Sequence, residues 1–352
     1  MFSSLPFNFM FLITMLIGTM ISLSSTHWLG MWIGLEVNLI GFLPMIVYMK
    51  KTAEGESAVK YFITQAIGSA FIILGSLLTF TLSFSWDLYN IQMDWSIGIW
   101  ILLGGLLLKL GLFPFHYWLP SVMAGMSWFS CLILATWQKL APLFLLVCLL
   151  ELNLFQSIPV ILCLIAVGSS LVGGIGGLNQ TQLRALLAYS SIGHLGWMVF
   201  SAMMSEWAMK IYLMIYIMIS LCLFTVLWLS NVNSMKGVIS VGNLYSYYVL
   251  VIILLLSLAG LPPLIGFMSK MMVILMAMVN PWVYAIFIMI IGSLMSLFYY
   301  LGLLFSMFLS SNKDNKSELE MFKKSSVMSI LIIMLNFLGG AGLLMMNLIY
   351  YI

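Results

Sequence analysis

The feature that most constrains this chain is a series of long apolar runs separated by short polar stretches. A helix needs about 20 apolar residues to cross the hydrocarbon core of a bilayer, and each run approaches or exceeds that length. We therefore expect about eleven transmembrane helices, over residues 5–24, 28–49, 57–83, 96–115, 120–148, 156–177, 182–204, 206–230, 243–276, 281–310 and 325–350.

The composition leaves little material for anything outside the membrane. Charged residues make up 7% of the 352 residues and hydrophobic residues 63%, whereas soluble domains carry about 25% charged residues. Such a chain must satisfy its backbone polar groups internally, within helices. The sequence predicts an all-α polytopic membrane protein in which residues 1–352 form one membrane domain. A net charge of +3 without basic–aromatic patterning does not predict nucleic-acid binding.

Lysine and arginine are distributed unequally between the two sides of the predicted membrane domain. If the N-terminus lies on side A, that side receives nine basic residues and side B receives only Lys210. Positive residues stay on the non-translocated side, so we expect side A to be that side and the C-terminus to lie on side B. The basic residues on side A are Lys50, Lys51, Lys60, Arg184, Lys236, Lys313, Lys316, Lys323 and Lys324.

Two of the predicted spans contain helix-breaking residues. The fourth span contains Pro114, and the ninth contains the adjacent pair Pro262 and Pro263. Proline removes a backbone donor and clashes with the preceding turn, so both helices should break or kink. We predict non-helical segments at Leu112–Phe115 and Leu261–Ile265. The alternative is a plain kink tolerated by packing.

The positions of these breaks predict an internal repeat. Residues 5–148 and 156–310 each hold five spans, and the broken span is the fourth of each set. Because five is odd, the second set enters the membrane inverted relative to the first. Paired broken helices in inverted repeats are typical of transporters and indicate the binding pathway. The run at 325–350 is then a separate C-terminal helix.

Five titratable residues lie inside apolar runs, where charge is costly. A lysine at the centre of a helix costs about 2.5–3.5 kcal/mol on insertion scales. Equivalent second spans carry Glu36 and His194, equivalent broken spans carry Lys109 and Lys270, and Lys139 lies in the fifth span. Burial disfavours a charge and an opposite charge favours it, so such groups can exchange protons. We predict a proton relay; the alternatives are lysines that reach the interface or a static ion pair.

Two further basic residues are secondary candidates. Lys60 begins the third span and could serve only as an interfacial anchor, and Arg184 opens the seventh span. The glycine-rich stretch before Arg184 follows an apolar helix and lacks the spacing of a nucleotide loop, so it predicts close helix packing. The sequence contains no cluster that predicts a metal site, a nucleophilic triad or a redox cofactor in this chain.

The stretches around these residues resemble the chain 2 family of mitochondrial NADH–ubiquinone oxidoreductase, an antiporter-like membrane subunit of respiratory complex I. The likeness runs from about residue 12 to 305 and lies in Trp-Ile-Gly-Leu-Glu36-Val-Asn, Lys60-Tyr-Phe-Ile-Thr-Gln, Lys109-Leu-Gly-Leu-Phe-Pro-Phe-His-Tyr-Trp, Thr-Trp-Gln-Lys139-Leu-Ala-Pro, Gly-Gly-Leu-Asn-Gln-Thr-Gln-Leu-Arg184, Tyr-Ser-Ser-Ile-Gly-His194-Leu-Gly-Trp and Gly-Leu-Pro-Pro-Leu-Ile-Gly-Phe-Met-Ser-Lys270. The length resembles the short animal form, which lacks three N-terminal spans. Ser269 departs from the family, which often has proline there.

The resemblance implies a proton-translocating subunit of an NADH:ubiquinone reductase in the mitochondrial inner membrane. It implies that Glu36, Lys109 and Lys139 form the proton-handling axis and that Lys270 matches the second broken-helix lysine. It also implies that side A is the matrix and side B the intermembrane space. NADH, flavin, iron–sulfur clusters and ubiquinone would act elsewhere in the complex. Partners would be chain 4 and chain 4L type subunits, accessory subunits and lipids.

Two other functions compete with this interpretation. A stand-alone cation/proton antiporter of related fold would share the buried charges and broken helices. A structural scaffold would not need the buried charges.

Overall fold

The computed structural model describes residues 7–48, 50–87, 97–152, 157–230, 245–278, 282–311 and 336. Within these ranges the chain is helical, and extended pairing is limited to an isolated bridge between His27 and Asp87. Seven helical stretches there are long and apolar enough to cross a membrane, and one of them, Trp128–Glu151, consists of two consecutive helices. The chain divides into two compact units, Met1–Leu162 and Cys163–Ile352.

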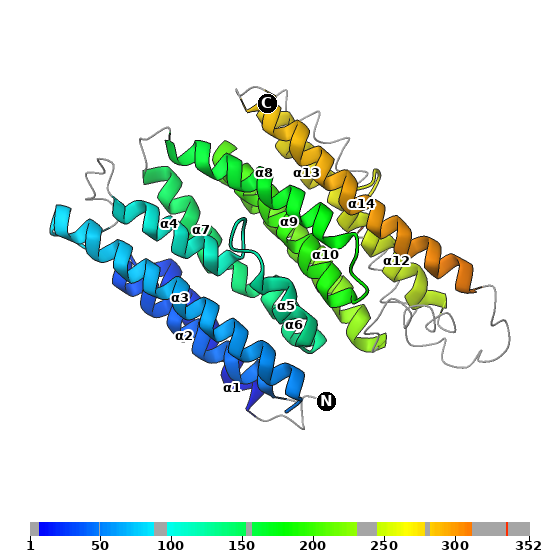
Figure 1. The fold of residues 1–352 in the computed structure, drawn as a ribbon, viewed down its shortest axis with the longest axis horizontal. Coiled ribbons are helices and arrows are strands. Elements are labelled where there is room, and N and C mark those ends of the chain that lie inside the picture. The colour runs from blue at the N-terminus through cyan, green and yellow to red at the C-terminus, as the bar shows by residue number, and fades with distance from the viewer. Residues whose placement is uncertain are drawn as a thin grey trace. The chain divides into compact units, whose positions relative to one another are not determined.

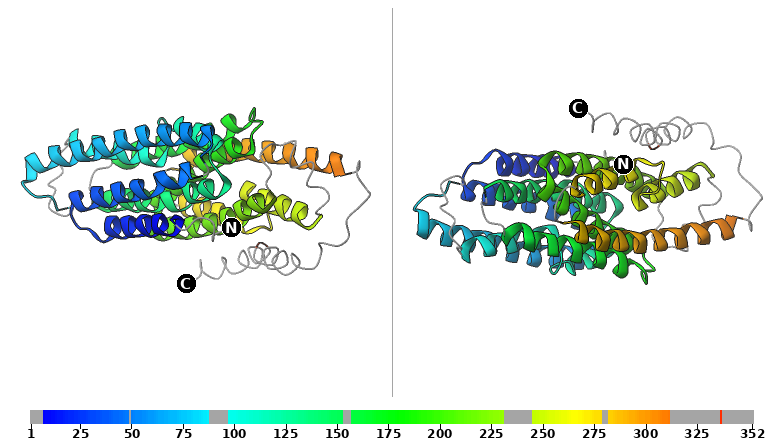
Figure 2. Two further views of the ribbon diagram at one scale, coloured as in Figure 1. Left: turned by 90° about the horizontal axis from the view of Figure 1, so that it is seen from below. Right: turned by 90° about the horizontal axis from the view of Figure 1, so that it is seen from above.

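The first unit is built on three long helices that lie side by side (Figure 1, Figure 2). They are α1 (Asn8–Ser24), α2 (Trp28–Val47) and α3 (Thr52–Ser83). Four shorter helices complete the unit, and α3 packs against two of them, α4 and α5. These are α4 (Ile97–Leu110), α5 (Trp118–Gly125), α6 (Trp128–Ala135) and α7 (Trp137–Leu152).

In the second unit α10 is the central element, since it packs against α9, α12 and α13, while α14 packs against α9 and α12. Helix α8 begins just before the unit boundary. The helices are α8 (Ser157–Gly177), α9 (Leu183–Met204), α10 (Glu206–Ser230), α12 (Tyr245–Ala259), α13 (Ile265–Ala277) and α14 (Val283–Ser311). The predicted helix at 325–350 and the loop from residue 312 to 325 lie outside the described residues, apart from Asn336.

Several helix boundaries differ from the apolar runs. Helix α3 begins at Thr52, not at residue 57, because its first turns are polar. A hydropathy pattern detects only the apolar part of a helix. The run at 120–148 is not one helix: α5 ends at Gly125, and α6 starts after Ser127, whose hydroxyl accepts from the Ser130 amide. Thr136 then separates α6 from α7.

The two predicted breaks coincide with non-helical segments. Residues 111–117 separate α4 from α5, and residues 260–264 separate α12 from α13. The second segment begins and ends one residue earlier than expected, because α12 ends at Ala259 and Ile265 already belongs to α13. Pro114 lies in the first segment, and Pro262 and Pro263 lie in the second.

Helices α1 and α2 approach each other closely through glycine. A Cβ atom on Gly34 would meet the Ser22 backbone nitrogen and would lie 2.7 Å from the Gly18 carbonyl oxygen. Small residues at such contacts allow membrane helices to pack by van der Waals contact.

Gly34→Ala is expected to destabilise the first unit by about 1–3 kcal/mol, because the added methyl group overlaps backbone atoms that cannot move independently. Gly104→Ala is the matched control, since no atom of the described part of the chain lies within 4 Å of a Cβ atom at that position in α4. The measurement is the amount of folded protein that survives heating in a mild detergent. Equal loss for the two variants would contradict the packing argument.

Candidate functional site

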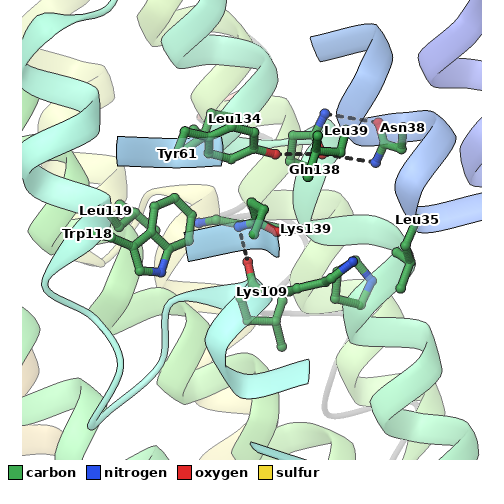
Figure 3. A pocket seen from close by; sticks show the side chains of 13 residues that line it. Leu35, Asn38, Leu39, Tyr61, Lys109, Trp118, Leu119, Leu134, Gln138 and Lys139 are labelled. Atoms are coloured by element: carbon green, nitrogen blue, oxygen red, sulfur yellow. Dashed lines mark hydrogen bonds between the residues drawn. The ribbon is translucent and has the colours of Figure 1, made fainter. Parts of the chain in front are cut away.

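A small cavity in the first unit brings together polar side chains from α2, α3, α4 and α7 (Figure 3). Its volume is about 20 Å³, which is room for about one water molecule. Lys109 and Lys139 both line it, so the structure brings together two of the predicted relay residues. The polar lining residues are Asn38, Tyr61, Gln65, Lys109, Gln138 and Lys139.

Lys109 is held in the last turn of α4, where only 6% of the residue is exposed. The helix ends because Gly111 adopts a left-handed backbone with φ 73°. The amides of Gly111 and Leu112 both donate to the Leu107 carbonyl, at 3.0 and 3.2 Å, a Schellman end. The end of a helix carries partial negative charge, which stabilises an ammonium group in the last turn.

Glu36 lies in the middle of α2 and is half-buried. Its Oε1 atom is buried and has no hydrogen-bond partner among the residues that the structure describes. The carboxylate is close enough to Lys109 and Tyr61 for its charge to act on both. Leaving a buried polar atom unpaired is costly, so a water molecule or a transferred proton would be stabilised there.

Lys139 is the third residue of α7 and is 4% exposed. Its neighbour Gln138 forms two hydrogen bonds with Asn38 of α2: Asn38 Nδ2 donates to Gln138 Oε1 at 2.9 Å, and Gln138 Nε2 donates to Asn38 Oδ1 at 3.0 Å. The Tyr61 hydroxyl points at the same Gln138 oxygen from 3.5 Å (Figure 3). The lysine therefore lies beside an ordered group of neutral polar side chains.

A second cavity of about 20 Å³ lies in the second unit and is lined by both His194 and Lys270. Serines and glycines of α8, α9 and α14 complete its wall. The glycine-rich stretch at residues 173–177 forms the end of α8, and a Cβ atom on Gly173 would lie 2.6 Å from the Gly193 nitrogen of α9. That stretch therefore serves close packing beside this cavity.

Lys270 is the sixth residue of α13 and is 7% exposed. Its ammonium donates to the Ala259 carbonyl, at the end of α12, over 2.8 Å. Gly260 has φ 81°, and the amides of Gly260 and Leu261 both donate to the Leu256 carbonyl, at 3.1 and 3.3 Å. The ends of α4 and α12 therefore have the same hydrogen-bond pattern, and each is close to a buried lysine.

His194 lies in α9 and is half-buried. Its Nδ1 atom is 3.0 Å from the Tyr212 hydroxyl of α10, and its ring centre lies 5.3 Å from that of Tyr216. These contacts fix the ring, while the cavity gives it access to Lys270.

The two secondary candidates lie outside these cavities. Lys60 forms an ion pair with Glu56 at 2.5 Å, and 46% of its side chain is exposed. Arg184 is the second residue of α9 and does not line the cavity that contains His194.

The neutral polar groups of both clusters were not among the residues predicted from the sequence. Asn38, Tyr61, Gln65 and Gln138 line the first cavity, and Tyr212 orients His194. Their weak signal in the sequence is that polar residues lie next to a charged candidate within an apolar run, as Gln138 does beside Lys139.

Comparison with known proteins identifies a family and relatives that are similar to this chain. Residues 25–297 match the family described as NADH:quinone oxidoreductase/Mrp antiporter, transmembrane. NADH-ubiquinone oxidoreductase chain 2 of Ornithorhynchus anatinus is 38% identical over 90% of both chains. The protein of the same name from Anopheles gambiae is 37% identical over 98% of both chains.

Two solved structures share the fold. A chain of respiratory complex I from Thermus thermophilus with bound aureothin has a TM-score of 0.80 at 24% identity, covering 98% of this chain and 78% of that one. A chain of the Mrp complex from Dietzia has a TM-score of 0.75 at 16% identity, covering 85% and 60%. At these identities the likeness concerns the fold alone.

Proposed function

The chain belongs to the NADH-ubiquinone oxidoreductase chain 2 family, and from that premise we propose that its two clusters of buried groups carry protons across the membrane. It is a multi-pass inner-membrane protein and a subunit of NADH:ubiquinone oxidoreductase, respiratory complex I. In this proposal the redox chemistry of NADH, flavin, iron–sulfur clusters and ubiquinone takes place in other subunits and drives the proton steps here.

One observation carries the proposal: each unit encloses a water-sized cavity with a buried lysine beside a helix interruption. Intramembrane ionisable residues are costly and mark proton or ion pathways. Glu36 and Lys109 would exchange a proton within the first unit and pass it to Lys139. His194 and Lys270 would do the equivalent work in the second unit. We propose that all five lie on one level, hydrated line. Lys60 and Arg184 stay secondary candidates outside this line, because neither lines one of the two cavities.

We further propose that the chain has eleven spans arranged as two inverted five-helix repeats, 5–148 and 156–310, followed by a span at 325–350. Equivalent helices would be α2 and α9, which carry Glu36 and His194. The interrupted pairs α4–α5 and α12–α13 would also be equivalent. Lys109 precedes its interruption and Lys270 follows its own, but Lys270 reaches back to the end of α12. In both units a lysine is thus associated with the end of the first half-helix: Lys109 lies in the last turn of α4, and the Lys270 ammonium donates to the last residue of α12.

The partners we propose are the other membrane-arm subunits, with chain 4 and chain 4L type subunits as neighbours, together with accessory subunits and lipids.

The second candidate function is a stand-alone cation/proton antiporter, which the similar fold of the Mrp chain favours. Purification in a mild detergent separates the two. Co-migration with NADH-oxidising subunits supports the first function, whereas isolation as a free carrier supports the second.

The distribution of basic residues predicts that the N-terminus and the loop at residues 310–325 face the matrix, and that the C-terminus faces the intermembrane space. Trypsin added to intact mitoplasts should therefore leave the loop uncut, although it contains four lysines: Lys313, Lys316, Lys323 and Lys324. Mitoplasts opened with detergent are the control and should be cut. Cleavage in intact mitoplasts would mean that the topology is inverted or that a span is miscounted.

A further inference from the structure

The paired amides of Asn38 and Gln138 line the same cavity as Lys109 and Lys139. They join α2 to α7 across 100 positions of sequence. Figure 3 shows the two side chains facing each other, with Tyr61 directed at the Gln138 oxygen from the other side. Asn38 is 3% exposed, so bulk solvent does not compete for its hydrogen bonds.

The hydrogen-bonding capacity of the Gln138 carbonyl oxygen is used up by this arrangement. An amide oxygen has two lone pairs. One accepts from Asn38 at 2.9 Å and the other faces the Tyr61 hydroxyl at 3.5 Å. The Gln138 nitrogen donates to Asn38 and lies 3.5 Å from the Met15 sulfur. Gln138 therefore presents no free acceptor to the cavity that it shares with Lys139.

A free acceptor in that position would compete for the proton on Lys139. Hydrogen bonds from an ammonium are about twice as strong as bonds between neutral groups, and they strengthen further in a dry interior. An amide cannot pass the proton on, because it does not titrate. A bond from the Lys139 ammonium to the Gln138 oxygen would therefore hold the proton instead of releasing it to water in the cavity.

We propose that Asn38 is a positioning residue that keeps the Gln138 oxygen away from Lys139, so that the Lys139 proton stays exchangeable. The inference rests on the proposed proton relay and adds a residue that acts on it through Gln138. On this proposal the two amides differ in their importance for pumping, because Asn38 is needed only when Gln138 is present. A simple structural clamp between α2 and α7 would make the two amides equally necessary.

The test compares three variants in the assembled complex: Asn38→Leu, Gln138→Met and the two combined. Protons moved per NADH are measured in reconstituted vesicles, normalised to the amount of assembled complex. Asn38→Leu should lose most of the pumping that Lys139→Met loses, because Gln138 is then free to hold the proton. The combined variant should regain most of that loss. Ser201→Ala is the control, since it removes a buried hydroxyl outside both cavities and should change nothing.

The inference is overturned if Asn38→Leu pumps normally, or if the combined variant is as deficient as Asn38→Leu. Either result would leave the relay intact as long as Lys139→Met still lowers the ratio. If Lys139→Met itself pumps normally, the proposed function fails, and the amide variants are then interpreted as structural changes alone.

Discussion

Replacing Lys109 or Lys139 by methionine is expected to remove this subunit's whole share of the protons pumped per NADH, while the complex still assembles. Both lysines are at least nine-tenths buried and line one cavity. Methionine keeps the length of the side chain but cannot carry a proton. The measurement is the ratio of protons moved to NADH oxidised in reconstituted vesicles.

Stability must be separated from pumping in this experiment. Removing Lys109 leaves the Glu36 carboxylate without its nearby positive charge, and an uncompensated buried charge is destabilising. Glu36→Gln combined with Lys109→Met removes both charges and should recover assembly without recovering pumping. An unchanged ratio in an assembled complex that lacks both lysines would refute the relay and leave the scaffold interpretation.

Lys60→Met is the matched control for these substitutions. Lys60 is about half-exposed and paired with Glu56, and exposed ion pairs contribute about 0–1 kcal/mol. If only the residues that line the cavity transfer protons, this variant should pump almost normally. A loss as large as that of Lys139→Met would extend the relay to α3.

Most helices could be predicted from the sequence because a membrane-crossing helix must be apolar over its whole buried length. The run at 156–177 became α8 (Ser157–Gly177), and the run at 182–204 became α9 (Leu183–Met204). The division of 120–148 could not be predicted, because it depends on a serine cap and on the backbone at Thr136. Hydropathy does not detect either feature. The start of α3 was missed because its first residues are helical without being apolar.

The site was partly predictable for a related reason. A lysine inside an apolar run is anomalous in any membrane sequence, so Lys109, Lys139 and Lys270 stand out by residue type. Neutral amides inside apolar runs are less costly, and their partners depend on tertiary packing. The hydrogen bonds between Gln138 and Asn38 therefore could not be predicted from the sequence. The common level of all five relay groups stays a prediction.

The interruption between α12 and α13 should be the most sensitive place for a small substitution. Gly266 lies in the first turn of α13, and a Cβ atom there would overlap the Ser257 carbonyl in the last turn of α12. Both partners are backbone, so the two half-helices would have to separate. Lys270 lies one turn after Gly266, and its bond to the Ala259 carbonyl depends on that contact.

Gly266→Ala is therefore expected to cost more than the roughly 1–3 kcal/mol typical of overpacking, a large share of the 5–15 kcal/mol that stabilises a typical protein. Little complex should assemble, and the fraction that does should pump no better than Lys270→Met, because the ammonium has lost its place at the end of α12. Gly302→Ala is the control, since none of the described residues comes within 4 Å of a Cβ atom there. Native gels give the amount assembled and vesicles give the pumping ratio. Normal assembly with normal pumping would show that contact between the half-helices does not hold Lys270 in place.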